Sequence, residues 1–212
     1  KIGLCEIVSS KENDKILFYN VGIGFGFAFC KKCGRATIEK ASAGDIPNFV
    51  QPGHYTLWNE QKCNATEHDI ARNVVFTGEL PTCYTVFRFK ENVVGQTYIR
   101  GSEQKALAFS IGVVIKRFLP KVIGIDESEI NFDIKFENNA WLVFVYDTAK
   151  GGCGYSLRLK DEKILKKVFE KAKEELEKST CNCHEDVGAC TKCLIDRYNY
   201  KRANLLSKEK VL

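Results

Sequence analysis

The alternation of apolar and small residues predicts strands in the N-terminal part of the chain. Between residues 24 and 29, glycine or alanine alternates with phenylalanine at a period of two, which is typical of a strand with one packed face. This run leads directly into Cys30. Residues 82–90 are rich in aromatic and β-branched side chains and predict a second strand. Between the two, residues 41–64 contain several prolines and glycines and are expected to form an irregular loop.

The second half of the chain changes to a mixed pattern of helices and strands. A long apolar run begins at Ser102, which is an acceptable N-cap, and reaches Pro120, where we expect the helix to stop. Few polar positions interrupt this helix, so it should be largely buried. Residues 131–137 alternate cleanly, and the turn at 138–139 leads into the apolar run 140–146, which together predict a β-hairpin.

The last part of the chain predicts two further helices. Asp161 caps a helix that extends to about Lys178, with apolar side chains on one face and Lys and Glu on the other. A cysteine-rich loop follows, and a final helix is expected from about Cys190 to Leu206. We place a domain boundary near residue 92, so that a β-rich region, residues 1–92, precedes a domain of residues 93–212.

Composition excludes several classes of protein. With 212 residues, 44% of them hydrophobic, the chain can bury one sizeable core or two small ones. Its longest apolar runs, such as 109–115, are far shorter than the roughly 20 residues of a membrane span, and no signal pattern precedes them, so we expect a cytoplasmic protein. Methionine is absent, which indicates a segment of a longer polypeptide. The net charge of +5 permits contact with nucleic acid without arguing strongly for it.

The chain contains ten cysteines, and several of them lie in close pairs, which indicates a function beyond packing. Disulfide-stabilised secreted domains are usually short and poor in core, whereas this chain has ample core and no signal pattern. The close pairs are therefore better interpreted as metal ligands in a reducing compartment.

The strongest of these signals is the CxC and CxxC pattern of Cys181, Cys183, Cys190 and Cys193. Zinc requires four soft or borderline ligands at tetrahedral corners, and two close pairs joined by a short loop can surround it without distant help. The spacing predicts a closed, structural zinc site. His184 could replace one thiolate, and the alternative interpretation is a set of buried or reactive thiols.

A second CxxC pair is formed by Cys30 and Cys33, and the following Gly34 permits the turn of a zinc knuckle. Two ligands do not make a site, so a second zinc requires ligands from the loop beyond. The nearest candidates are His54 and Cys63, with His68 and Cys83 in reserve. The alternative is a redox pair or two inert thiols, although no βαβ pattern supports a thioredoxin-like role.

A glycine-rich loop at residues 150–154 directly follows the apolar run. It lacks the nucleotide-binding patterns GxxxxGK[ST] and GxGxxG, so it does not indicate a phosphate site. Asp147, just before it, would be the catalytic carboxylate if the chain were a nuclease or hydrolase. A lone carboxylate at the end of a strand more often caps a turn.

Basic and aromatic side chains are mixed in the tail, on the helix expected there. Lysine and arginine could neutralise phosphates while tyrosine stacks on bases, and a solvated helix face is an equally good interpretation. The candidate nucleic-acid contacts are Arg197, Tyr198, Lys201 and Arg202.

From about Gln96 to Leu206 the chain resembles the MrfA-like zinc-binding (MZB) domain, which is found in MrfA-type superfamily 2 DNA helicases and in the DrmB subunit of the DISARM phage-defence system. The motifs that carry this resemblance are the apolar helix from Ser102, YDTxxGGxGY at 146–155, the amphipathic helix, CxC…CxxC at 181–193 and Tyr-Asn at 198–199. The upstream GFxFCKKCG is similar to the region that precedes the domain in the same proteins. After Tyr-Asn the chain departs from the family, which often continues with Gln, His and a closing Leu-Asp-Arg.

The resemblance implies that the C-terminal cysteine quartet holds zinc and that the parent protein is a helicase or helicase partner in DNA repair or phage defence. The expected fold is α+β: a mixed sheet with two packed helices and a C-terminal zinc-bound helical segment, preceded by a β-rich zinc-knuckle region. No Walker A sequence is present, so this chain alone is not expected to hydrolyse ATP. We therefore expect a non-catalytic, zinc-binding module that supports engagement of DNA or of a partner protein. The alternatives are an enzyme that uses Asp147 and a pure protein-interaction scaffold.

Overall fold

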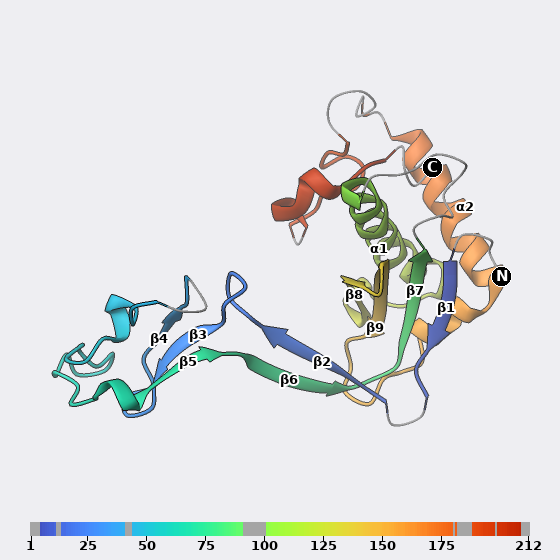
Figure 1. The fold of residues 1–212 in the computed structure, drawn as a ribbon. Coiled ribbons are helices and arrows are strands. Elements are labelled where there is room, and N and C mark those ends of the chain that lie inside the picture. The colour runs from blue at the N-terminus through green and yellow to red at the C-terminus, as the bar shows by residue number, and fades with distance from the viewer. Residues whose placement is uncertain are drawn as a thin grey trace. The chain divides into compact units, whose positions relative to one another are not determined.

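The structure is a computed structural model of the 212-residue chain. It describes residues 5–11, 14–40, 44–90, 101–179, 181, 188–197 and 199–208. The chain divides into two compact units, a larger one of residues 1–15 and 81–212 and a smaller one of residues 16–80 (Figure 1). The boundary expected near residue 92 lies outside the described residues. Within the described ranges, no helix combines the length and apolar character that crossing a bilayer demands.

The larger unit is built on a four-stranded sheet with the order β1-β7-β9-β8. Its strands are β1 (Cys5–Ser9), β7 (Tyr84–Lys90), β8 (Ile130–Glu137) and β9 (Ala140–Asp147). All three pairings are antiparallel, so this sheet is antiparallel rather than mixed. The predicted hairpin is confirmed, and the turn residues Asn138 and Asn139 have φ angles of 49° and 54°, as a tight two-residue hairpin turn requires.

Helix α1 (Gly101–Ile123) packs on β8 and β9 and is largely buried, as its apolar sequence predicted. The expectation that Pro120 would stop it is wrong, because the helix continues for three more residues. Phe118 and Leu119 are fully buried, and this packing holds the last turn in place although proline donates no hydrogen bond. Gly124 ends the helix with a φ of 77°, and its N–H donates to the carbonyl of Pro120 at 2.8 Å.

Helix α2 (Glu162–Lys178) packs against α1 and confirms the predicted amphipathic helix. The Asp161 carboxylate caps it by accepting a hydrogen bond of 2.9 Å from the N–H of Lys163. Short 3₁₀ turns, η3 (Glu127–Glu129) and η4 (Ser156–Lys160), complete this part of the larger unit. The buried face of α2 joins the main core through Leu165, Val168, Ala172 and Leu176.

The helix expected from Cys190 to Leu206 is wrong. The described residues form a tight turn after Cys190 and then a 3₁₀ helix, η5 (Tyr200–Leu205). Buried Asn199 explains the difference, because its side-chain amide donates to the carbonyl of Leu194 at 2.8 Å and its carbonyl oxygen accepts from the N–H of Asp196 at 2.8 Å. These bonds replace the ladder that a continuous helix would use.

Two small antiparallel arrangements make up the smaller unit. Strand β2 (Lys15–Asn20) pairs with β6 (Phe76–Pro81), and β3 (Phe27–Cys30) lies between β4 (Ala36–Ile38) and β5 (Ile70–Val74) (Figure 1). Strand β3 starts later than predicted, because Gly24 and Gly26 adopt φ angles of 116° and 80° in a turn. The irregular loop contains the short η1 (Asn48–Val50) and an isolated bridge between Tyr55 and Lys62 in its described residues, and η2 (Glu67–Asp69) follows it.

The hydrophobic core of the smaller unit is minimal. Among the described residues it consists of six buried ones, two of them cysteines and two alanines: Ala28, Cys30, Val50, Cys63, Ala65 and Ile70. A core of this size supplies little of the free energy that offsets chain entropy in a unit of this length. A cross-link through its cysteines would add to the stability of such a unit.

Candidate metal centres

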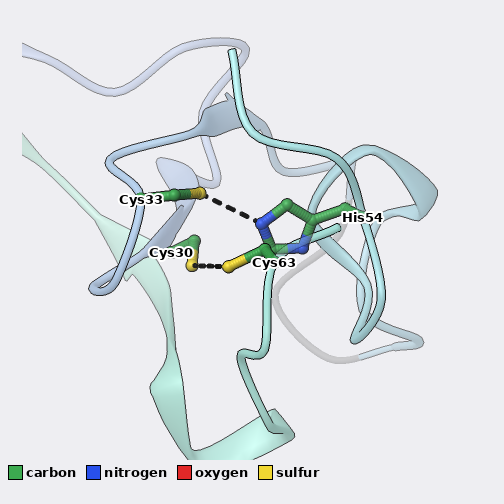
Figure 2. A group of neighbouring side chains, drawn as sticks. All are labelled: Cys30, Cys33, His54 and Cys63. Carbon is green, nitrogen blue, oxygen red and sulfur yellow. Dashed lines mark hydrogen bonds between the residues drawn. The ribbon is translucent and has the colours of Figure 1, made fainter. Parts of the chain in front are cut away.

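The first cluster brings together Cys30, Cys33, His54 and Cys63, whose ligand atoms all lie within 4.8 Å of one another (Figure 2). Cys30, His54 and Cys63 are buried, and Cys33 is half-buried. The Sγ atoms of Cys30 and Cys63 are 4.0 Å apart. Sulfur atoms at two corners of a zinc tetrahedron, each about 2.3 Å from the ion, would lie about 3.8 Å apart. The donor set and its spacing therefore fit zinc.

The CxxC turn supplies hydrogen-bond donors to Cys30. Gly34 adopts a φ of 76°, and its N–H donates to the carbonyl of Cys30 at 2.9 Å, which closes the knuckle. Burial raises the pKa of the Cys30 thiol, but hydrogen bonds from the backbone N–H groups of Cys33 and Lys32 and from the thiols of Cys33 and Cys63 together outweigh it, so that this pKa lies below its ordinary value. For Cys33 burial dominates and raises the pKa.

His54 is oriented by the backbone. Its Nδ1 lies 2.8 Å from the carbonyl oxygen of Gln51, and its Nε2 lies 3.1 Å from the Sγ of Cys33. A hydrogen bond from Nδ1–H to a carbonyl leaves the Nε2 lone pair for a metal, which is the usual arrangement of zinc-bound histidine. In addition, the N–H of Cys63 donates to the carbonyl of His54 at 2.7 Å, so these two ligands close a loop between them.

Reserve candidates for this site lie elsewhere. His68 is exposed in η2, and Cys83 packs beside Gly152 in the larger unit. Neither belongs to the ligand group among the described residues.

The second cluster joins three of the predicted quartet, Cys181, Cys190 and Cys193, with ligand atoms again within 4.8 Å. Cys183 and the possible substitute His184 lie outside the described residues. The Sγ atoms of Cys190 and Cys193 are 3.9 Å apart, and the N–H of Cys190 donates to the Sγ of Cys193 at 3.1 Å. Burial raises the pKa of Cys193. Three thiols in this arrangement fit part of a tetrahedral thiolate site.

This second cluster is embedded in the main core rather than standing apart from it. Cys181, Cys193 and Leu194 all belong to the core of the larger unit. The carbonyl of Cys190 accepts hydrogen bonds from three successive N–H groups, those of residues 193–195, at 3.0–3.1 Å. The guanidinium of Arg117, on α1, donates to the carbonyl of Cys193. The position of the cluster is thus coupled to α1.

A buried lysine that the sequence analysis overlooked lies beside this cluster. Lys208 is only 2% exposed, and its Nζ lies 2.9 Å from the Oγ of Ser179 and 3.7 Å from the Sγ of Cys181. Its backbone N–H donates to the carbonyl of Gly188 at 2.7 Å, which brings the end of the described chain onto the cysteine loop. Nothing in the local sequence marks this lysine, because only the tertiary structure buries it.

The carboxylate of Asp147 is held by backbone hydrogen bonds, as expected of a residue that caps a turn. It is fully buried, and its carboxylate oxygens accept hydrogen bonds from the N–H groups of Cys153, Tyr155 and Ser156 at 2.7, 3.1 and 2.8 Å. The carboxylate thus fixes the glycine-rich loop. Gly152 is required there, since a Cβ atom would lie 2.4 Å from the backbone nitrogen of Cys83.

Three of the four candidate nucleic-acid residues of the tail, Arg197, Lys201 and Arg202, are described, and all three are exposed. Tyr198 lies outside the described residues. Arg202 also contacts the rest of the larger unit, with its NH1 3.4 Å from Asp133 Oδ1 in β8 and its guanidinium 5.6 Å from the ring centroid of Phe109 in α1.

Comparison with known protein families agrees with the resemblance that the sequence motifs indicated. Residues 111–194, less than half of the chain, match the family model of the MrfA Zn-binding domain. No curated protein matches the chain.

Two crystal structures of the DUF1998 helicase MrfA were also compared. The complex with DNA is 17% identical over 68% of this chain, with a TM-score of 0.46. The complex with DNA and AMPPNP is 15% identical over 74% of this chain, with a TM-score of 0.41. The chain spans 18% of the length of each helicase. The resemblance to the MrfA Zn-binding domain that the sequence motifs indicated is confirmed over residues 111–194 by the family model. This range includes the second cysteine cluster.

Proposed function

We propose that this chain is a non-catalytic, zinc-stabilised module of a helicase or helicase-associated protein, and that it supports engagement of DNA or of a partner protein in DNA repair or phage defence. The observation that carries the proposal is the match of residues 111–194 to the zinc-binding domain named after MrfA, a helicase. The described cysteines of the second cluster lie within that match.

Two zinc ions per chain are part of the proposal. Cys181, Cys183, Cys190 and Cys193 would hold one. The group of Cys30, Cys33, His54 and Cys63 would hold the other. Zinc supplies closed, tetrahedral cross-links here and no chemistry, because four protein ligands leave no position for a substrate. The small core of residues 16–80 and the irregular segment after Cys190 are the parts that such cross-links would stabilise.

The ligand assignment is tested by metal content. We expect the purified chain to contain two zinc ions, and Cys190→Ser and Cys63→Ser each to lose one. Cys153→Ser is the matched control, since Cys153 is exposed and belongs to neither cluster. Full zinc content in Cys190→Ser would contradict the assignment of the C-terminal site.

The role in DNA engagement is tested separately, by titrating the zinc-loaded chain with duplex and single-stranded DNA at increasing salt. Phosphate contacts make affinity fall with salt, so binding at low salt that weakens on salt addition supports the proposal. If neither DNA binds at low salt, the chain is instead a protein-interaction scaffold.

A further inference from the structure

An open cleft of about 560 Å³ lies in the larger unit. The basic and aromatic residues of the tail did not by themselves indicate it. The start of α1 contributes Lys105, the β8–β9 hairpin contributes Phe136 and Trp141, and η5 contributes Arg202. Its volume is within the range of ligand-binding clefts in proteins.

An aromatic pair forms one wall of this cleft. Phe136 and Trp141 are cross-strand neighbours in the hairpin, with ring centroids 5.3 Å apart and an interplanar angle of 51°. Phe136 is 50% exposed although it is large and apolar, and Trp141 is half-buried. An aromatic surface open to solvent offers a flat face on which another ring can stack.

Positive charge surrounds the pair. Lys105 places its Nζ 5.7 Å from the ring centroid of Trp141. Lys135 and Arg202 also line the cleft, and each pairs with a carboxylate: Arg202 NH1 lies 3.4 Å from Asp133 Oδ1, and Lys135 Nζ lies 2.7 Å from Glu137 Oε2. With Glu137 counted beside the lining, three cations stand against two carboxylates, so these described residues keep a small excess of positive charge, which attracts a polyanion.

We propose that this cleft binds single-stranded nucleic acid, with a base stacked on the Phe136–Trp141 pair and neighbouring phosphates on Lys105, Lys135 and Arg202. This inference rests on the proposed engagement of DNA and names where it occurs. A single strand fits better than a duplex, because the base faces of a duplex are already stacked. An acidic peptide would use the cations but would gain little from the aromatic pair.

The test uses the zinc-loaded chain and a labelled oligothymidylate of about 15 nucleotides, near the upper end of known single-strand site sizes. We expect Phe136→Ala to weaken binding about tenfold, as loss of one base-stacking platform does. Phe136 is half exposed, so this change should leave the fold intact. Lys105→Gln should reduce the slope of log affinity against log salt by about 0.7, the value for one phosphate contact on a single strand.

Matched controls are available outside the cleft. Trp58→Ala removes an aromatic side chain that is 89% exposed in the smaller unit, and Lys166→Gln removes a lysine that is 76% exposed on α2. Both should bind as the unaltered chain does. A matched duplex of equal length should bind more weakly than the single strand.

The outcomes separate the two proposals. If the unaltered chain binds no DNA, the proposed DNA engagement and this site both fail. If it binds but Phe136→Ala and Lys105→Gln bind as the controls do, the engagement stands and this cleft is not the site. Stronger binding of duplex than of the single strand would also overturn the stacking arrangement.

Discussion

The Nζ atom of Lys208 lies 3.7 Å from the Sγ atom of Cys181, and both side chains are buried. In the described part of the chain, no carboxylate forms an ion pair with this lysine. A buried ammonium needs hydrogen-bonding or anionic partners. A metal-bound thiolate at Cys181 would be such a partner, so the charge of Lys208 should favour metal binding.

The first prediction concerns this contact. Lys208→Met removes the charge but keeps an unbranched apolar side chain, and it should lower the zinc affinity of the C-terminal cluster about tenfold, as loss of partners around metal ligands does. Competition with a coloured chelator measures this affinity. Lys166→Met, at an exposed site on α2, is the control. Equal zinc affinity in both variants would show that Lys208 is only a packing residue.

A second prediction concerns the close approach of α1 to the sheet at Gly112. A Cβ atom there would lie 2.2 Å from the Phe132 ring. Alanine favours helix over glycine by about 1 kcal/mol, but the overlap should cost more, so Gly112→Ala is expected to destabilise the larger unit by about 1–2 kcal/mol net. Urea unfolding measures the change. Gly78→Ala, where nothing lies within 4 Å, should be nearly neutral, and a stabilised Gly112→Ala variant would refute the close contact.

The third prediction concerns the ion pair between Arg72 and the buried Glu39 in the smaller unit. Glu39 is 1% exposed, and Arg72 donates to both of its carboxylate oxygens, at 2.5 and 2.9 Å. The hydrogen bonds from Arg72 outweigh burial and hold the pKa of Glu39 below its ordinary value of 4.5. A group with a lowered pKa stabilises the fold fully above its unfolded pKa and loses this contribution as pH falls through the folded pKa.

We therefore expect Glu39→Gln to reduce the free energy of unfolding by about 1–3 kcal/mol at neutral pH. The difference from the unaltered chain should shrink as the pH falls below about 4.5. Parallel urea titrations across this range measure it, and comparing the two chains at each pH cancels the acid release of zinc that they share. A difference that is constant with pH would contradict the charged pair.

The fourth prediction separates a structural from a catalytic Asp147. Asp147→Asn replaces one of the oxygens that accept backbone N–H bonds with a donor, so stability should fall by about 3 kcal/mol. DNA binding by the folded fraction should not change. A variant that keeps its stability and its DNA binding but loses a detectable cleavage activity would favour the nuclease or hydrolase alternative.

Much of the fold could be predicted because it depends on local patterns. The hairpin follows from alternation around Asn138–Asn139, and α2 follows from its apolar face and the Asp161 cap. Two helix predictions failed, the first for a tertiary reason and the second because of hydrogen bonds within the segment itself. Packing of Phe118 and Leu119 carries α1 past Pro120, and the buried amide of Asn199 replaces a helix with turns.

The sequence by itself determined which residues are suited to bind metal. Spacing alone identifies the two CxxC pairs and the CxC before the second as candidate metal ligands. Ligands two or three residues apart can reach one ion from a single turn. The tertiary structure decided what spacing could not. It brought the nearest candidates, His54 and Cys63, to the first CxxC pair, buried Lys208 against Cys181, and assembled the cleft from α1, the hairpin and η5. These contacts join residues far apart in the chain, and only the packing of the core brings them together.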